Sequence, residues 1–276
     1  MSMTVRTNVN ALSAARQLGV TNQDLGGTLD RISSGLRIVR AADDAAGLGV
    51  ATNLETAYLS TRVGVRNAND GISIIQTAEG ATNEVTDILQ RMRELAVQSS
   101  SGTLDDDERA YIEDEFVELS EEVARIAAVT EFNGTLLADG TVTQISVQVG
   151  INNAASSRID IDLGDLSTST LGIDTASIDL SSVTGARSAI DDIDNALDSV
   201  NGFRSDLGAV QNRLDSSINN SEIYVESLAG AESMIRDADF AFETAQMTKL
   251  QIMQQAGVAA LAQAKNMNQS AVSLLS

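Results

Sequence analysis

Residues 67–98 read NANDGISIIQTAEGATNEVTDILQRMRELAVQ, and their pattern predicts one long helix. Apolar or small side chains recur three or four residues apart along this stretch, as they do on one face of an α-helix. The same face extends back towards residue 47, so we predict a helix over residues 47–99. Its early positions are small, which allows a neighbouring backbone to approach closely. The face comprises Leu54, Ala57, Gly64, Ala68, Gly71, Ile75, Ala78, Val85, Leu89, Met92 and Ala96.

Two more helices are predicted in the N-terminal half of the chain. Residues 4–34 carry an apolar stripe, and residues 35–46 break the pattern and predict a connector. A third helix is predicted over residues 104–129, and Asn133-Gly134 just beyond this range is expected to close it. The first stripe comprises Val5, Val9, Leu12, Leu18, Leu25, Leu29, Ile32 and Leu36, and the third helix carries Ile112, Phe116, Leu119, Val123 and Ile126.

The period of the pattern changes to two after the third helix. Ile145, Val147 and Val149 alternate with polar residues, and a second alternating run follows a turn-like stretch. Such a pair of runs predicts a β-hairpin at about residues 141–163. Residues 164–184 are rich in Ser, Thr, Asp and Gly, so we expect a surface loop there.

The chain returns through two more predicted helices. Residues 185–235 show a heptad with two registers, one from Ile190 to Val225 and the other from Ile193 to Leu228. Arg204, Gln211 and Ser221 interrupt these registers, either to define the pairing or as solvent-facing positions. The last helix, at about 237–275, repeats Leu250, Leu261 and Val272 every eleven residues, which is nearer to straight-helix geometry than to a heptad.

That last helix has too little apolar surface to be stable alone, and the N-terminal helix matches it in length and charge. The predicted fold class is therefore mostly α. It is a long antiparallel helical coiled-coil rod with paired N- and C-terminal helices and a small β-hairpin.

Composition excludes several classes of function. The chain has no Cys, His, Pro or Trp, so disulfides, thiolates and the usual neutral-pH base are missing. We expect no catalysis, no cofactor and no metal site. The net charge of −21 argues against nucleic acid. No apolar run is long enough to span a membrane, and we expect no cleavable signal peptide.

The charge is unevenly distributed. Residues 1–40 carry five Arg and two Asp, and residues 241–276 carry two Lys and one Glu, so both ends are slightly basic while the middle is strongly acidic. We expect the near-neutral ends to be buried against copies of the same chain and the acidic middle to be solvated.

Several long motifs, in order and at both ends, resemble bacterial flagellin. They are VNALSAARQL (9–18), SSGLRIVRAADDAAGLGVA (33–51), NANDGISIIQTAEGATNEV (67–85), LQRMRELAVQ (89–98), EFNGTLL (131–137), GAVQNRLDSSINN (208–220), ESMIRDADFAFETAQMTKLQIMQQAG (232–257) and LAQAKNMNQSAVSLL (261–275). The resemblance implies an inner-core domain of residues 1–42 plus 237–276, which orders on assembly. It also implies a rod-like helical domain of residues 43–236. Further outer domains of longer flagellins are absent from the short interval 164–184, so the chain resembles a minimal flagellin.

The implied function is a structural subunit that polymerises into the extracellular filament of the bacterial flagellum for swimming motility. Implied partners are other copies of the chain, the flagellar export apparatus, a flagellin-specific export chaperone, the filament cap, hook-associated proteins and, where a host is met, the innate immune receptor TLR5. One alternative is a hook–filament junction protein. The other is an enzyme such as a carboxylate-based hydrolase or a protease flagellin, whose zinc motif requires the His that this chain lacks.

The resemblance also supplies candidate contact residues. In LQRMRELAVQ they are Arg91 and Leu95, with Glu115 on the neighbouring helix, and either a neighbouring subunit or TLR5 would contact them. Asp43 and Asp44 would make subunit contacts with Arg37 or Arg40, or would cap a helix. The remaining interface candidates lie on the last helix and are Leu250, Leu261 and Val272.

Overall fold

The computed structural model describes residues 7–175 and 178–273. The described residues form two compact units, which are treated separately below. One unit comprises the residues up to Ala57 together with those from Ser227 onward, and the other comprises Tyr58–Glu226. The mostly helical fold class with a small antiparallel hairpin is confirmed.

Long helices build the unit Tyr58–Glu226. They are α2 (Ala45–Ser99), α3 (Asp106–Val129) and α5 (Val183–Arg236), of which α2 and α5 continue beyond this unit. The predicted face of α2 is the one that packs, because its positions from Gly64 to Ala96 are all buried. Asp105 caps α3 through a reciprocal capping box with Glu108, and the acidic first turn suits the positive end of the helix.

Two small antiparallel hairpins follow α3. β1 (Glu131–Phe132) pairs with β2 (Thr135–Leu136) across Asn133 and Gly134, whose positive φ angles of 50° and 80° are those of a tight hairpin turn. Asn133-Gly134 therefore turns a hairpin and does not close α3, which ends at Val129. β3 (Gln144–Gln148) pairs with β4 (Arg158–Asp162), which confirms the predicted hairpin.

Residues 164–184 are not the surface loop that their polar composition predicted. A short helix, α4 (Thr168–Leu171), and the flanking chain bury a set of aliphatic side chains in the core. Two serine hydroxyls hold the backbone of this segment: Ser120 Oγ donates to the Ile173 carbonyl (2.9 Å), and Ser99 Oγ donates to the Leu180 carbonyl (2.7 Å). The buried set is Leu166, Leu171, Ile173, Ile178 and Leu180.

The packed face of α5 follows only one of the two predicted heptad registers. Ile193, Val200, Leu207 and Leu214 of the second register are buried, whereas the first register from Ile190 is only half-buried. Small and aromatic side chains supply the alternate layers instead. Arg204 and Gln211 thus flank the seam and do not interrupt it. The alternate layers are Ala189, Ala196 and Phe203, and Ala186 continues the register of Ile193 towards the start of the helix.

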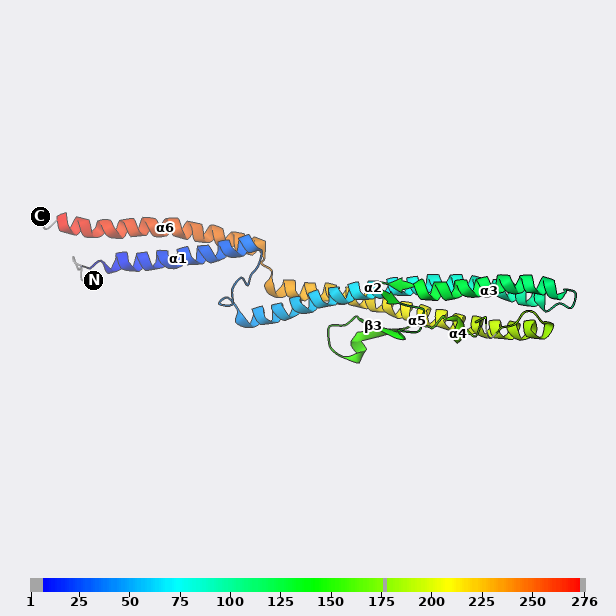
Figure 1. Ribbon diagram of the computed structural model, residues 1–276. Coiled ribbons are helices and arrows are strands. Elements are labelled where there is room, and N and C mark those ends of the chain that lie inside the picture. The colour runs from blue at the N-terminus through cyan, green and yellow to red at the C-terminus, as the bar shows by residue number, and fades with distance from the viewer. Residues whose placement is uncertain (1–6, 176–177, 274–276) are drawn as a thin grey trace. The chain divides into compact units, whose positions relative to one another are not determined.

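The second unit is built on the paired helices α1 (Val9–Ser34) and α6 (Phe240–Ser273), which lie side by side (Figure 1). Asn8 is the N-cap of α1, so the helix begins later than the predicted residue 4 would place it. Gly35 ends α1 in the left-handed region (φ 72°), and a short bridge joins Leu36 to Asp237. The paired terminal helices are therefore confirmed as antiparallel partners.

Candidate functional site: the paired terminal helices

The contact between α1 and α6 is a heptad seam made largely of small and polar side chains. On α1, partly or fully buried positions alternate in steps of three and four, and on α6 they alternate in steps of four and three. The eleven-residue spacing of Leu250 and Leu261 is the sum of such steps, so the described part of this helix follows a heptad. The seam comprises Ala11, Ala14, Leu18, Thr21, Leu25, Thr28 and Ile32 on α1, and Glu243, Met247, Leu250, Gln254, Gly257, Leu261 and Ala264 on α6.

Many large apolar side chains of this unit point to solvent. On α1 the buried residues are two threonines, Thr21 and Thr28, and none of its leucines or valines is buried. Phe240 and Phe242 are 57% and 65% exposed, although buried aromatic rings normally dominate a core. An exposed apolar surface of this extent marks an interaction site. Its members are Val9, Leu12, Val20, Leu29, Val50, Met234, Phe240, Phe242, Ile252, Met253 and Val258.

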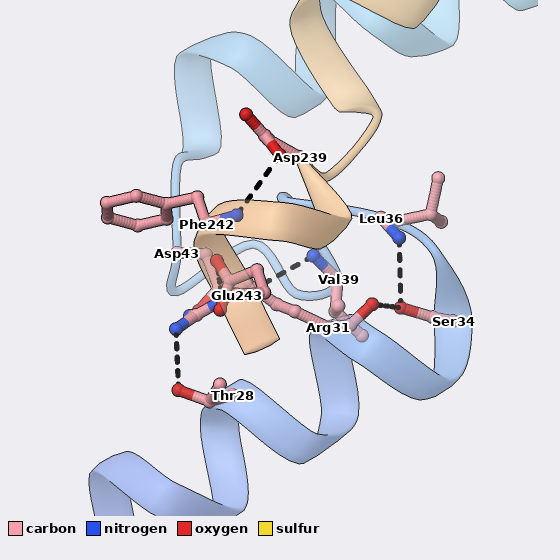
Figure 2. A network of polar contacts seen from close by, with 9 residues as sticks. All are labelled: Thr28, Arg31, Ser34, Leu36, Val39, Asp43, Asp239, Phe242 and Glu243. Carbon is pink, nitrogen blue, oxygen red and sulfur yellow. Dashed lines mark hydrogen bonds and ion pairs between the residues drawn. The ribbon is translucent and has the colours of Figure 1, made fainter. Parts of the chain in front are cut away.

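A polar network lies at the end of the seam where α1 ends and α6 begins (Figure 2). Arg31 Nε donates to Glu243 Oε1 at 2.9 Å, and Arg31 Nη2 donates to Thr28 Oγ1 at 3.4 Å. Asp239 caps α6 by accepting from the backbone N–H groups of Ala241 and Phe242. The Arg31–Glu243 pair was not predicted from the sequence. Its only signal there was a basic residue in the last turn of one helix and an acidic residue in the first turn of another.

Within the chain, the connector between α1 and α2 is held mainly by hydrogen bonds of its two aspartates to backbone N–H groups. Asp43 accepts from the backbone N–H of Arg40 at 2.8 Å, and this hydrogen bond lowers the pKa of Asp43. Asp44 accepts from the Gly47 N–H at 2.8 Å and so caps α2. Arg40 pairs instead with Asp30 at 2.7 Å. Asp44 thus caps α2, whereas Asp43 accepts from the N–H groups of Val39 and Arg40 and so holds a turn of the connector. Contact of the two aspartates with Arg37 or Arg40 of another subunit stays a prediction.

Arg37 also has partners other than the predicted aspartates. Its Nη2 donates to the Ile235 carbonyl at 2.5 Å, and its backbone N–H donates to the Arg236 carbonyl at 2.6 Å. These bonds tie the connector to the chain that enters α6.

The structure brings Arg91 and Glu115 together on neighbouring helices. Arg91 Nη2 lies 2.8 Å from Glu115 Oε1, and Arg91 Nη1 lies 2.9 Å from Glu94 Oε2. Both partners of the interhelical pair are about half exposed, so the pair is open to a contact. Leu95 is 2% exposed and belongs to the core, so it offers no surface anchor beside Arg91.

The three interface candidates on α6 differ in what the structure shows of their side chains. Leu250 is 4% exposed because it packs in the seam with α1, and Leu261 is half-buried in the same seam. Both are thus occupied by the partner helix of their own chain. The side chain of Val272 lies outside the described residues.

Among residues 7–175 and 178–273, no group of three acidic, His or Cys side chains is placed to hold a metal ion. Over the same residues, every helix falls short of the length and apolarity that crossing a membrane requires.

A pair of helices that buries little of its own apolar surface defines a class of protein: a subunit whose fold is completed by other subunits. The model of the bacterial flagellin N-terminal helical region matches residues 5–143, and that of the C-terminal helical region matches residues 190–275. The chain belongs to the bacterial flagellin family.

Individual relatives agree with this assignment. A flagellin of Halalkalibacterium halodurans is 44% identical over 273 residues, which cover 99% of this chain and 100% of that protein. Several longer flagellins also match, and the chain spans less than half of their length. The crystal structure of Bacillus cereus flagellin is 31% identical, covers 56% of this chain and 88% of that one, and has a TM-score of 0.50.

The hook-associated alternative has weaker support. A putative flagellar hook-associated protein from Vibrio parahaemolyticus shares the fold, with a TM-score of 0.57 over 70% of this chain and 100% of that one, but only 16% identity. The family models and the full-length relative identify a structural subunit of the flagellar filament. Flagellin self-polymerises into this extracellular filament, and the family is structural and not enzymatic.

Proposed function

We propose that the outward apolar surface of α1 and α6 is the surface through which copies of this chain assemble. In this proposal residues 1–42 and 237–276 form the inner core of the filament, and residues 43–236 form the outer helical domain. Two non-helical segments support the borders between these domains: Gly35–Asp44 separates α1 from α2, and Asp237–Asp239 separates α5 from α6.

One observation carries the proposal: among the described residues, nine large apolar side chains of α1 and α6 are at least 40% exposed. Burying such a side chain contributes about 1.5–3 kcal/mol when burial is complete, so partial burial of several against a neighbour is sufficient to drive association. The low net charge of both chain ends reduces repulsion between copies. A contact between different faces of identical subunits propagates as a helical filament when its rotation does not close a ring.

Polymerisation of purified protein, measured by sedimentation and electron microscopy, tests this proposal. Phe242→Ser and Val258→Ser each remove an exposed apolar side chain of α6 and should slow growth at least about tenfold, whereas Gln255→Ser on the same helix should not. Deleting residues 1–34 or 241–276 should stop growth altogether. Normal filaments from the Phe242→Ser, Val258→Ser double variant would refute the assignment.

The same exposed helices are the surface that we propose for the other partners of the chain. The flagellar export apparatus, a flagellin-specific export chaperone, the filament cap and hook-associated proteins all meet the subunit before its neighbours cover α1 and α6. Co-purification of a chaperone with the wild-type chain, and its loss with Phe242→Ser, would support this. Retention of that complex by a chain lacking residues 241–276 would contradict it.

For Arg91 and Glu115 we propose packing between subunits as the native role, with TLR5 recognition where a host meets the bacterium. The half-exposed, hydrogen-bonded pair supports this role because an Arg already held in place loses little conformational freedom on binding. Arg91→Ala should weaken filaments against heating and lower TLR5 reporter activation, while Arg125→Ala, from an exposed pair within α3, should do neither. Equal behaviour of the two variants would exclude a special role for Arg91.

A further inference from the structure

The seam between α1 and α6 is poorly suited to define its own register. Its layers repeat every seven residues, and many of them hold small side chains such as Ala11, Ala14, Gly257 and Ala264. A shift of seven residues replaces small layers by other small layers, so apolar packing alone distinguishes the registers weakly. In coiled coils a buried polar group commonly selects one register.

Arg31 and Glu243 form an ion pair at one end of this seam, with Glu243 inside the seam and Arg31 on its flank. The Glu243 side chain is 7% exposed and the Arg31 side chain 28%, and Thr28 beside them is 1% exposed. Arg31 is in the last turn of α1 and Glu243 is in the first turn of α6, where the helix dipoles favour these signs of charge. Within the described residues, Glu243 Oε2 is buried without a hydrogen-bond partner, so the carboxylate depends on Arg31.

Other contacts show that a single register runs along the whole pair. Asn8 Nδ2 donates to the Ala264 carbonyl at 2.8 Å, and Gln254 Nε2 donates to Asn22 Oδ1 at 2.7 Å. A Cβ added at Gly257 would meet Leu18 at 3.2 Å, which reflects the close approach of the two helices.

A shift of seven residues in either direction would place the two charges badly. In one direction Glu243 comes opposite Asp24, which is repulsive, and Arg31 passes beyond the first residue of α6 and loses its carboxylate partner. In the other direction Glu243 faces Ile38, beyond the end of α1, and Arg31 faces Leu250, so two charges lose their partners against apolar side chains. The native register is the one of the three that pairs them.

We propose that Arg31 and Glu243 are positioning residues that set the register in which α1 and α6 pair. This inference rests on the assembly function proposed above. A shift of seven residues corresponds to about 10 Å along a helix, enough to separate the exposed apolar side chains of α6 from those of α1. The ion pair thus determines which composite surface a neighbouring subunit meets.

The burial of the pair predicts an asymmetry between single variants. Arg31→Leu leaves a buried carboxylate without its partner and should slow polymerisation at least about tenfold. Glu243→Leu leaves an arginine that reaches solvent more easily, so its effect should be smaller. The double variant Arg31→Leu, Glu243→Leu removes both charges and should polymerise faster than Arg31→Leu alone, because a buried ion pair is often replaceable by apolar residues.

Engineered cysteines report the register directly, since the chain has none of its own. Ala11→Cys with Ala264→Cys occupies facing seam positions in the native register. Leu18→Cys with Ala264→Cys meets only after a shift of seven residues. Each pair is introduced into the full chain, and disulfide formation is measured by electrophoresis after polymerisation. The wild-type background should cross-link through the native pair alone, and the double variant through both pairs.

The exposed pair Asp30–Arg40 in the same unit is the matched control. Asp30→Asn with Arg40→Gln should leave the cross-link pattern unchanged. If the double variant at Arg31 and Glu243 cross-links only through the native pair, as wild type does, the register inference is wrong. That result would not count against the proposed assembly surface, because the Phe242 and Val258 variants test that surface separately.

Discussion

Gly64 offers a sharp test of how the β3–β4 hairpin is seated on α2. A Cβ added at this glycine would lie 2.3 Å from the Val149 carbonyl oxygen, roughly 1 Å inside normal contact. The obstacle is backbone, so it cannot rotate away, and we take the overpacking cost at about 3 kcal/mol. Alanine gains about 1 kcal/mol over glycine within a helix. Gly64→Ala should therefore destabilise the unit by about 2 kcal/mol.

Gly80 is the control, because it lies on the same helix and a Cβ there meets nothing within 4 Å. Gly80→Ala should stabilise the protein by about 0.5–1 kcal/mol, the ordinary helix preference. Thermal unfolding followed by circular dichroism measures both, with Tm lowered by roughly 4–8 °C for Gly64→Ala and raised by roughly 1–4 °C for Gly80→Ala. Equal or greater stability of Gly64→Ala relative to wild type would refute the close seating of the hairpin.

Three further perturbations follow from single contacts. Leu180 is fully buried, so Leu180→Ala should lower the free energy of unfolding in urea by about 2–4 kcal/mol. Ser181→Ala should lower it by less than about 0.5 kcal/mol. Equal effects of the two variants would support the prediction that residues 164–184 are a surface loop. Arg109 is 6% exposed and donates to three backbone carbonyls at the end of α2 and in the turn after it. Arg109→Ala should therefore lower the free energy of unfolding by about 3 kcal/mol and make that turn more sensitive to protease. Unchanged proteolytic cleavage in the turn would disprove this role of Arg109. Burial, with the charges of Asp179 and Asp114, raises the pKa of Glu113. Folding thus favours its protonated form, so Glu113→Gln should raise Tm at pH 7, and this gain should vanish as pH falls below the pKa of the unfolded chain, about 4.3; a pH-independent gain would point to another cause.

Much of the fold could be predicted from local periodicity. The packed face of α2 from Gly64 to Ala96 follows directly from spacing in steps of three and four, because a helix brings such positions to one side wherever it packs. The β3–β4 hairpin follows from alternation in the same way. The polar segment 164–184 was misjudged because its buried residues lie in a short irregular stretch without a repeating period.

The candidate site shows a similar division. The sequence indicated that the chain ends pair, from their matched length and low charge. It also supplied the residues that connect α1 to α2, and within the chain Asp43 and Asp44 bond to backbone N–H groups close in sequence. Leu95 shows one error, because a residue in a surface-like motif can still point inward.

By itself, the sequence determined the helices, the larger hairpin and the family, since each depends on residues close together or on motifs read in order. Only the tertiary structure decided which faces meet. Arg31 and Glu243 lie 212 residues apart, and no local pattern relates them. The alanine layers of α5 became visible as core only after packing, because a small side chain is buried or exposed according to what the fold places opposite it.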